Sequence, residues 1–450
     1  MSYLLPSHPS ILCEDPLGIC GDSATVTAWG VISAAILSTT NATLELASAS
    51  HLPELVETLV YSLHGNGLLD TQGLRLFLHR NYADALFPLY SAIFTAALSL
   101  PDVLPTHEIP YLTDQHPKVS LSDDQMNAIL AHQLLGTLAP PPGGWGSPTF
   151  TCWYAGSNPH PMAIEGYLRT LFNHFSCLAA STPLHTQFYL AQVAEMLDWE
   201  ECEMPMQMTL MHIDEESEPS DQEGTPAIVI ASNRQPGFGP SGTQEERLFA
   251  SSLYLCPLVL FCPVLPTRAA IVTSPIPVHA AWRGHNRTAR LAGLYPRTSR
   301  PNRCYMLMDA LELDAYEQPQ AGAGLPDLAA GNVERELCKV YAACLGLRTM
   351  YPHHTPVVEA GAWGCGAFGG NIVVKGIIMA MASSRAGAHI HLRLLKERIG
   401  DLELIGKVIE TGSTVGQIMI AMRRNSEATK CQDGVALVQL LLAPPINVTV

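Results

Sequence analysis

The chain has 450 residues, of which 47% are hydrophobic and 15% charged, and its formal net charge is −16. This length and apolar content suffice for one large domain or two ordinary ones. No uninterrupted apolar run of about 18 residues occurs, so we expect no membrane span. The first residues lack the pattern of a secretory signal, and the acidic balance argues against nonspecific binding to nucleic acids.

The first part of the chain reads as helical. Apolar residues recur there at mixed three- and four-residue spacings, over Leu52–Leu63, Gly73–Ala97, Ser122–Leu138 and Ile164–Leu178. A Pro- and Gly-rich segment, Ala139–Pro148, interrupts this pattern and is the best internal boundary. We therefore expect a helical accessory domain over residues 1–150 and a second domain over residues 151–450.

Short apolar runs typical of strands dominate the second part. They are Met206–Ile213, Ala227–Ile230, Leu258–Leu265, Ala269–Ser274, Cys304–Met308 and Val357–Glu359. Helical patterns lie between or after them at Thr243–Ser252, Asn332–Leu345 and Ile372–Ser384. Strands that alternate with helices predict an α/β layer with a mostly parallel sheet.

The residues that most often bind metals do not form a metal-binding pattern here. The twelve cysteines are scattered without a CxxC pair, which is typical of buried thiols in a reducing compartment. The acidic stretch Asp214–Glu223 reads as a solvated surface loop. His353 and His354 lack ligand-spaced partners and read as loop residues. We expect no metal site and no cofactor.

Two glycine-rich turns stand between an apolar run and a helical pattern. The first is Gly237–Gly242, directly followed by Thr243-Gln-Glu-Glu246, and the second is Gly361–Gly370. Glycines at such junctions let the backbone approach a ligand closely, and a helix N-terminus attracts negative charge. Carboxylates beside a turn that favours phosphate suggest catalysis on a phosphate-bearing ligand.

Both turns fit the GxGxxG pattern of dinucleotide-binding proteins. In those proteins an acidic residue follows about 20 positions later. Here the corresponding positions near Cys262–Leu265 and near His389–His391 hold none. A nucleotide-dependent oxidoreductase is therefore the least favoured alternative.

The glutamate pair also has a purely structural interpretation. Thr243-x-x-Glu246 is a capping box, in which the Glu246 side chain returns a hydrogen bond to the Thr243 backbone. Glu245 would then be an acid in the first turn of a helix, favoured by the helix dipole.

The wider pattern resembles a known family. Asn233-Arg-Gln-Pro-Gly237-Phe-Gly239, followed by Gln244-Glu245-Glu246, resembles the Gly-Gly-Gly…Gln-Glu-Glu signature of poly(ADP-ribose) glycohydrolases. The second turn, Gly361–Asn371, is similar to the diphosphate loop of that family and is the more specific element. Leu121-Ser-x-x-Gln125 is similar to its accessory helical domain, and Met308–Leu311 to a family strand end.

This resemblance implies a macrodomain-like mixed sheet flanked by helices, preceded by an all-helical accessory domain. It implies hydrolysis of the ribose–ribose O-glycosidic bonds of poly(ADP-ribose). Glu246 would be the general acid that protonates the leaving ribose oxygen, and then the general base for water. Glu245 and Asn233 would hold ribose hydroxyls, and Gln244 would support the site.

The resemblance also implies the binding residues. Gly237 and Gly239 would lie against the ligand, and the backbone amides of Gly364, Gly366 and Gly369 would surround the diphosphate. Phe368 would pack against the ligand. The position of Trp282 corresponds to an aromatic clasp that stacks on adenine, although a half-buried structural tryptophan is an equal alternative. These expected site residues are Asn233, Gly237, Gly239, Gln244, Glu245, Glu246, Trp282, Gly364, Gly366, Phe368 and Gly369.

The chain departs from the family at the first turn. Phe238 replaces the middle glycine, and only Pro240–Thr243 separates the glycines from Gln244, which is shorter than in the family. A catalytically weakened or inactive ADP-ribose-binding macrodomain is therefore the main alternative. The expected partners are poly(ADP-ribose), ADP-ribose and ADP-ribosylated proteins, without direct nucleic-acid or membrane binding. The resemblance implies a role in the DNA damage response, in the nucleus or cytoplasm.

Overall fold

A computed structural model describes residues 1–21, 25–45, 47–65, 69–83, 85–143, 148–178, 185–194, 197–215, 227–314, 324–353, 355–424 and 431–443. The chain forms two compact units. Unit 1 comprises residues 1–188, 235–264 and 276–302, and unit 2 comprises residues 189–234, 265–275 and 303–450. The boundary expected at residue 150 stays a prediction.

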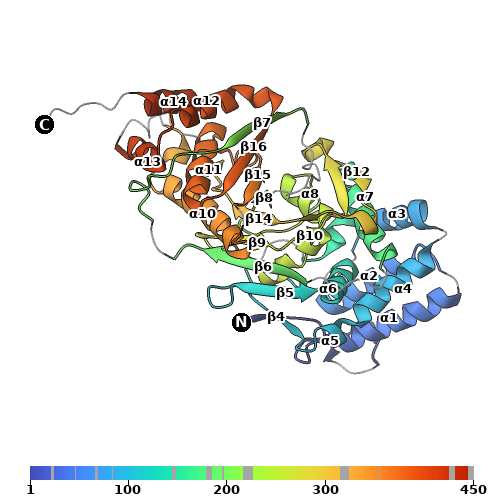
Figure 1. The fold of residues 1–450 in the computed structure, drawn as a ribbon. Helices are drawn as coiled ribbons and strands as arrows, with labels where there is room; N and C mark the ends of the chain where they lie inside the picture. The colour runs from blue at the N-terminus through green and yellow to red at the C-terminus, as the bar shows by residue number, and fades with distance from the viewer. Residues whose placement is uncertain are drawn as a thin grey trace. The chain divides into compact units, whose positions relative to one another are not determined.

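Helices dominate the beginning of unit 1, with short strands between them (Figure 1). Its elements up to residue 188 are β1 (Ser2–Leu4), β2 (Leu12–Cys13), β3 (Val26–Thr27), α1 (Ala28–Glu45), α2 (His51–His64), α3 (Gln72–Tyr82), α4 (Leu86–Leu98), α5 (Leu100–Val103), β4 (Glu108–Pro110), β5 (Lys118–Ser122), α6 (Asp123–Leu135), η1 (Phe150–Trp153), α7 (Pro161–Ser176) and the start of β6 (His185–Gln192). The helical N-terminal region is confirmed. The helix expected over Gly73–Ala97 is divided into α3 and α4.

Two later segments complete unit 1. They form α8 (Gln244–Ser251), η2 (Leu253–Leu255), α9 (Leu258–Phe261), β10 (Ile276–Pro277), β11 (Ala280–Arg283), η3 (Asn286–Thr288), β12 (Arg290–Leu294), η4 (Arg297–Ser299) and the start of β13 (Asn302–Arg303). The strand expected over Leu258–Leu265 is wrong, because α9 begins after Pro257 and takes up the first half of the run, and no strand follows in the second half. A short apolar run buried on all sides does not distinguish strand from helix by periodicity, and the fixed φ of proline suits a helix start.

Unit 2 alternates strands with helices. Its elements are the remainder of β6, β7 (Thr209–Ile213), β8 (Ala227–Ser232), β9 (Ala269–Thr273), β14 (Tyr305–Asp309), η5 (Pro326–Leu328), α10 (Asn332–Met350), β15 (Val357–Ala360), α11 (Ile372–Ala386), β16 (His389–Leu395), η6 (Lys396–Arg398), α12 (Ile399–Glu410), α13 (Val415–Arg424) and α14 (Gly434–Leu442). The apolar run Met206–Ile213 becomes a strand only in its second half. The acidic stretch Asp214–Glu223 lies outside the described residues from residue 216 onwards.

In the described part of unit 2, the strands of the main sheet follow the order β6-β9-β14-β8-β15-β16-β7. In unit 2, β14 pairs in parallel with β8, β15 with both β8 and β16, and β16 with β7. Strand β14 pairs with β9 in the antiparallel direction. The sheet is therefore mixed and mostly parallel at its centre, as the alternating pattern predicts.

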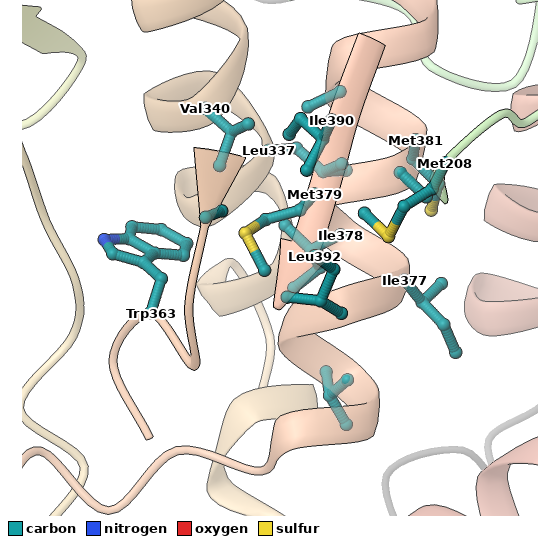
Figure 2. Close-up of a cluster of buried hydrophobic side chains, with 14 of the residues drawn as sticks. Met208, Leu337, Val340, Trp363, Ile377, Ile378, Met379, Met381, Ile390 and Leu392 are labelled. Carbon is teal, nitrogen blue, oxygen red and sulfur yellow. The ribbon is translucent and has the colours of Figure 1, made fainter. Parts of the chain in front are cut away.

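One hydrophobic cluster forms the core of unit 2. It joins strand residues such as Leu392 to Leu337 and Val340 of α10 and to Met379 of α11 (Figure 2). Helix α11 is apolar on most of its surface and is buried along most of its length, as expected for a helix covered on several sides. Trp363, just after β15, lies in the same cluster. Among the helices of the described residues, none is long and apolar enough to cross a membrane.

Candidate functional site

The Gly237–Glu246 loop ends at the first turn of α8. The Glu246 carboxylate accepts hydrogen bonds from residues of the same loop. Its Oε2 accepts hydrogen bonds from the Thr243 backbone N–H at 3.1 Å, from the Thr243 hydroxyl at 2.7 Å and from the Ser241 hydroxyl. Its Oε1 accepts one from the Ser241 N–H at 3.3 Å. The predicted capping box is therefore present. Gln244, the first residue of α8, is half-buried.

The two glycines that precede α8 each lie near one glutamate. Glu245 is 9% exposed, and its Oε1 accepts a hydrogen bond from the Gly237 N–H at 3.0 Å. Gly239 lies directly against Glu246, because a Cβ on Gly239 would overlap the Glu246 carboxylate. The structure thus brings Gly237, Gly239, Glu245 and Glu246 together within unit 1.

Phe238, the residue that replaces a glycine of the family, packs against aromatic side chains of unit 1. Its ring centroid lies 4.8 Å from that of Phe150 and 5.6 Å from that of Trp153. The Trp153 indole N–H donates a hydrogen bond to the Gly239 carbonyl at 2.9 Å. The same aromatic residues therefore pack against the Phe238 side chain and hold the backbone of the loop.

Trp282 lies in the interior of unit 1. It is 1% exposed, and its ring centroid lies 4.9 Å from that of Tyr167. A Cβ at Gly166 of α7 would overlap the edge of the indole. In this arrangement the ring has no free face for an adenine, so a role as an aromatic clasp would require Trp282 to leave its packing. Tyr167 also donates a hydrogen bond to the Ser241 carbonyl at 2.6 Å.

Asn233 lies in unit 2, directly after β8. Its side-chain amide donates a hydrogen bond to Glu312 Oε1 at 3.4 Å, and the residue is half-buried. Glu312 follows β14. Because β8 and β14 are parallel neighbours, Asn233 and Glu312 leave the sheet at the same edge, where ligands bind in open α/β sheets.

The Gly361–Gly370 loop of unit 2 connects β15 to α11. It turns through hydrogen bonds of its own backbone, from the Gly369 N–H to the Gly366 carbonyl at 3.1 Å and from the Gly370 N–H to the Gly364 carbonyl at 2.9 Å. Asn371 then caps α11, because its Oδ1 accepts hydrogen bonds from the backbone N–H groups of Val373 at 3.0 Å and Val374 at 3.2 Å. A turn of glycines that leads into a helix N-terminus is a favourable place for an anion.

The glycines of this loop differ in what surrounds them. Gly364 has a φ of 73°, and its backbone lies close to Ala310 and to the end of the Lys375 side chain. Gly366 is exposed, and a Cβ there would meet no atom within 4 Å. Gly364 is therefore required by the fold, because few other residues adopt such a φ, whereas Gly366 leaves backbone open to an approaching ligand.

Phe368 and Gly369 lie at the end of the same loop. The Phe368 carbonyl accepts hydrogen bonds from the N–H groups of Leu313 at 2.9 Å and Asp314 at 3.2 Å. Its half-buried ring packs against the core cluster of unit 2. Gly369 is exposed and has a φ of 69°. The segment after β14 thus holds the loop from one side.

A buried ionic cluster lies beneath the Gly361–Gly370 loop. Lys375 of α11, only 1% exposed, pairs with Glu336 of α10 and lies 3.7 Å from Asp327. Arg335 pairs with Glu336 as well. The Asp327 carboxylate accepts a hydrogen bond from the Asn371 N–H at 3.1 Å, and burial raises the pKa of this carboxyl. The cluster therefore joins the end of the loop to α10.

The sequence predictions did not include this cluster, nor Trp153 and Tyr167. The burial of Lys375 could have been predicted from the sequence, because Lys375 is the only charged residue in the otherwise apolar run Ile372–Ser384. A lysine that is buried at such a position needs a charged partner. The aromatic residues gave no comparable signal, since they look like ordinary core residues.

Among the described residues, no three His, Cys, Asp or Glu side chains gather in a way that would hold a metal ion. Of the two adjacent histidines in the loop before β15, only His353 belongs to the described residues.

Comparison with known proteins connects these loops to a family. Residues 196–398 match the family model for the poly(ADP-ribose) glycohydrolase (PARG) catalytic domain, described as having a macro domain fold. Poly(ADP-ribose) glycohydrolase 1 of Caenorhabditis elegans is 27% identical over 158 residues, which are 33% of this chain. The match spans only 20% of the length of that relative.

Solved structures give further similarities. One is the glycohydrolase of Deinococcus radiodurans in complex with ADP-ribose, at 15% identity, covering 48% of this chain and 93% of the other, with a TM-score of 0.33. Another is the glycohydrolase of Thermomonospora curvata bound to the inhibitor ADP-HPD, at 18% identity, covering 46% of this chain and 78% of the other, with a TM-score of 0.32.

The matched residues 196–398 contain both glycine-rich loops, Asn233 and the glutamate pair. The mixed sheet flanked by helices agrees with the macro domain fold of the family model. The resemblance of this chain to the poly(ADP-ribose) glycohydrolase family, which the two loops indicate, is thereby confirmed over residues 196–398.

Proposed function

We propose that this protein hydrolyses the ribose–ribose O-glycosidic bonds of poly(ADP-ribose) and releases ADP-ribose. The observation that carries the proposal is the pairing of two adjacent glutamates with two glycines. Glu245 accepts a hydrogen bond from Gly237, and Glu246 lies against Gly239, within the segment that matches the family model. Such an arrangement brings a carboxylate next to backbone that a ligand can approach closely.

Glu246 is the proposed general acid and base. Its carboxyl gives a proton to the ribose oxygen that leaves as the glycosidic C–O bond breaks. The resulting carboxylate then takes a proton from the water whose oxygen forms the new bond to the same carbon. The proposed roles of Glu245, Asn233 and Gln244 are to hold ribose hydroxyls and support this geometry.

The Gly361–Gly370 loop is the proposed binding element for the diphosphate. Its exposed Gly366 leaves room for a ligand, and the capped N-terminus of α11 follows it directly. Backbone N–H groups and the helix dipole attract the phosphates. Phe368 would line the ligand. ADP-ribosylated proteins are the proposed larger substrates, and a role in the DNA damage response in the nucleus or cytoplasm stays a prediction.

One observation favours a second candidate function, ADP-ribose binding without hydrolysis. The Glu246 carboxylate already accepts four hydrogen bonds from Ser241 and Thr243. A carboxylate used in this way acts as a helix cap. Catalysis requires that at least one of these hydrogen bonds be exchanged for one to the substrate.

Two measurements on the purified chain separate the candidates. The first is release of ADP-ribose from poly(ADP-ribose), followed by chromatography, for the wild type and for Glu246→Gln. The second is the calorimetric affinity for ADP-ribose. We expect release by the wild type, a rate about 10²- to 10⁴-fold lower for Glu246→Gln, and the same affinity for both.

The outcomes lead to different conclusions. A wild type that binds ADP-ribose but releases none from polymer supports the binding function and contradicts hydrolysis. Equal rates for wild type and Glu246→Gln would show that Glu246 is only a cap. Thr243→Ala is the matched control, because it removes a capping hydroxyl and leaves the carboxylate in place.

A further inference from the structure

Two aromatic side chains from outside the Gly237–Glu246 loop hold its backbone at two points. The Trp153 indole N–H donates a hydrogen bond to the Gly239 carbonyl at 2.9 Å, and the Tyr167 hydroxyl donates one to the Ser241 carbonyl at 2.6 Å. Trp153 is the last residue of η1, and Tyr167 lies in α7, which packs against α8 within unit 1 (Figure 1). The loop is therefore anchored by residues that lie 86 and 74 positions earlier in the chain.

The two anchored residues are also the ones that lie next to the Glu246 carboxylate. Ser241 donates a hydrogen bond from its N–H to Oε1 at 3.3 Å and another from its hydroxyl to Oε2. Gly239 is so close that a Cβ there would overlap Oε1. One chain of contacts thus runs from Tyr167 through Ser241 to Glu246. A second runs from Trp153 through Gly239 to the same carboxylate.

Both anchoring side chains are themselves fixed by burial. Trp153 and Tyr167 are 0% exposed, and their ring centroids lie 5.2 Å apart. Trp153 also stacks on Phe150, with 4.6 Å between the ring centroids. Burial, and next the charge of Glu246, raise the pKa of Tyr167 well above its ordinary value, so the hydroxyl keeps its proton and remains a donor. Because a buried donor that loses its acceptor is costly, both side chains hold their carbonyls firmly.

The composition of the loop explains why it needs support from outside. It contains three glycines within six residues, Gly237, Gly239 and Gly242, and glycines lose more conformational freedom than other residues when they are fixed. A displacement of about 1 Å can cost about a hundredfold in rate. Because the anchors hold the backbone, the Ser241 hydroxyl can turn from Glu246 to another partner without movement of the peptide. This freedom suits the exchange of hydrogen bonds that catalysis by Glu246 requires.

We propose that Tyr167 and Trp153 are positioning residues for the reaction proposed for Glu246. They act on the backbone of the loop, and their effect on the reaction passes through the position of the Glu246 carboxylate. The inference rests on the proposed function. It adds that two residues of the helical N-terminal region complete the site, although they lie before the residues 196–398 that match the family model.

The test removes the Tyr167 hydroxyl and leaves the ring in place. With poly(ADP-ribose) as substrate, Tyr167→Phe should lower kcat about tenfold, because the carboxylate loses part of its positioning. KM should stay within about twofold of the wild-type value, since the substrate contacts are unchanged. Calorimetry should give the wild-type affinity for ADP-ribose.

Tyr90→Phe is the matched control. Tyr90 of α4 belongs to the same unit, is 0% exposed and donates its hydroxyl to the Ser48 carbonyl at 2.9 Å, outside the loop. Its replacement should lower the melting temperature about as much as Tyr167→Phe does and leave kcat at the wild-type value. Trp153→Phe, which removes the indole N–H and keeps an aromatic ring, should lower kcat without a change in KM.

A double variant shows whether the effect passes through Glu246. In a Glu246→Gln background, Tyr167→Phe should cause no further loss of ADP-ribose release, because the carboxylate that it positions is already absent. Hydrogen exchange followed by mass spectrometry adds a measurement that does not depend on catalysis. The peptide that contains residues 239–246 should exchange faster in Tyr167→Phe than in the wild type and in Tyr90→Phe.

The inference is overturned, and the proposed function stands alone, if the wild type hydrolyses polymer and Tyr167→Phe has the kcat of Tyr90→Phe. Full additivity of Tyr167→Phe with Glu246→Gln overturns it as well, and a Trp153→Phe variant with the wild-type kcat overturns the second anchor. A wild type that releases no ADP-ribose contradicts the proposed function instead. Hydrogen exchange then decides on the anchoring: faster exchange of the loop in Tyr167→Phe alone supports it, and equal exchange in all three proteins overturns it.

Discussion

The two glycine-rich loops look alike in sequence but are built differently. In the Gly237–Glu246 loop, charged side chains lie within the loop and accept hydrogen bonds from its own backbone. In the Gly361–Gly370 loop, the charges lie beneath the loop, at Lys375 and its partners, and Gly366 is open. The proposed roles follow this difference: a reactive carboxylate in the first loop, and an anion held by backbone N–H groups in the second.

The comparison teaches which departures from the family matter. Phe238 looks in sequence like an obstruction, yet its ring packs against Phe150 and Trp153 of the same unit. The hydrogen bonds that Ser241 and Thr243 donate to the Glu246 carboxylate matter more for the proposed hydrolysis, because a substrate would have to compete with them. Three stability predictions sharpen the contrast between the units that carry the two loops.

Removal of the buried lysine beneath the second loop should have the largest effect. Lys375→Met leaves the Glu336 and Asp327 carboxylates without this partner in a buried place, which costs about 3–5 kcal/mol of unfolding free energy. Denaturant unfolding measures the loss. Arg398→Gln is the control, because its ion pair with Asp401 is exposed and is worth less than about 1 kcal/mol. Similar losses for both variants would contradict the described role of Lys375.

Acid should weaken unit 1 through three buried histidines. Burial lowers the pKa of His132 to about 4, that of His174 to about 3 and that of His279 well below its usual 6.5. Because the unfolded chain binds protons at higher pH than the native one, stability is greatest above pH 6.5 and falls as the pH decreases towards 4. The loss at pH 5.5 that His132 alone contributes is about 1.4 kcal/mol.

Unfolding at a series of pH values checks this dependence. His132→Gln should reduce the slope of stability against pH between 6.5 and 5, because it removes one of the titrating groups. His79→Gln, at an exposed position, should leave the slope unchanged. A wild type whose stability is constant over this range would contradict the assignment.

Gly364→Ala should have the smallest of the three effects, about 1–2 kcal/mol from the φ of 73°, with an addition from crowding against Ala310. Gly412→Ala is a matched control, since Gly412 has a φ of 67° and open space around its Cβ position. The difference between the two variants measures the crowding. Equal losses would show that the loop is not tightly packed on Ala310.

Much of the fold and part of the site could be predicted from the sequence. The capping boxes at Ser122 and Thr243 and the glycine-rich helix start at Asn371 are local features, so nearby residues suffice to specify them. The wrong strand at Leu258–Leu265 and the burial of Trp282 depend on what packs against them, which local patterns do not contain.

The central claim is that the first loop serves catalysis and the second serves binding. It is tested most directly by measuring, for Glu246→Gln and Gly366→Val side by side, both the release of ADP-ribose from polymer and the affinity for ADP-ribose. Gly293→Val is the control for the second variant, because Gly293 is an equally exposed glycine with open space around it.

We predict that Glu246→Gln keeps its affinity and loses release about 10²- to 10⁴-fold. Gly366→Val should remain as stable as the wild type to within about 0.5 kcal/mol and should bind ADP-ribose at least about tenfold more weakly. The opposite pattern, with hydrolysis unaffected by Glu246→Gln and affinity unaffected by Gly366→Val, would contradict the account.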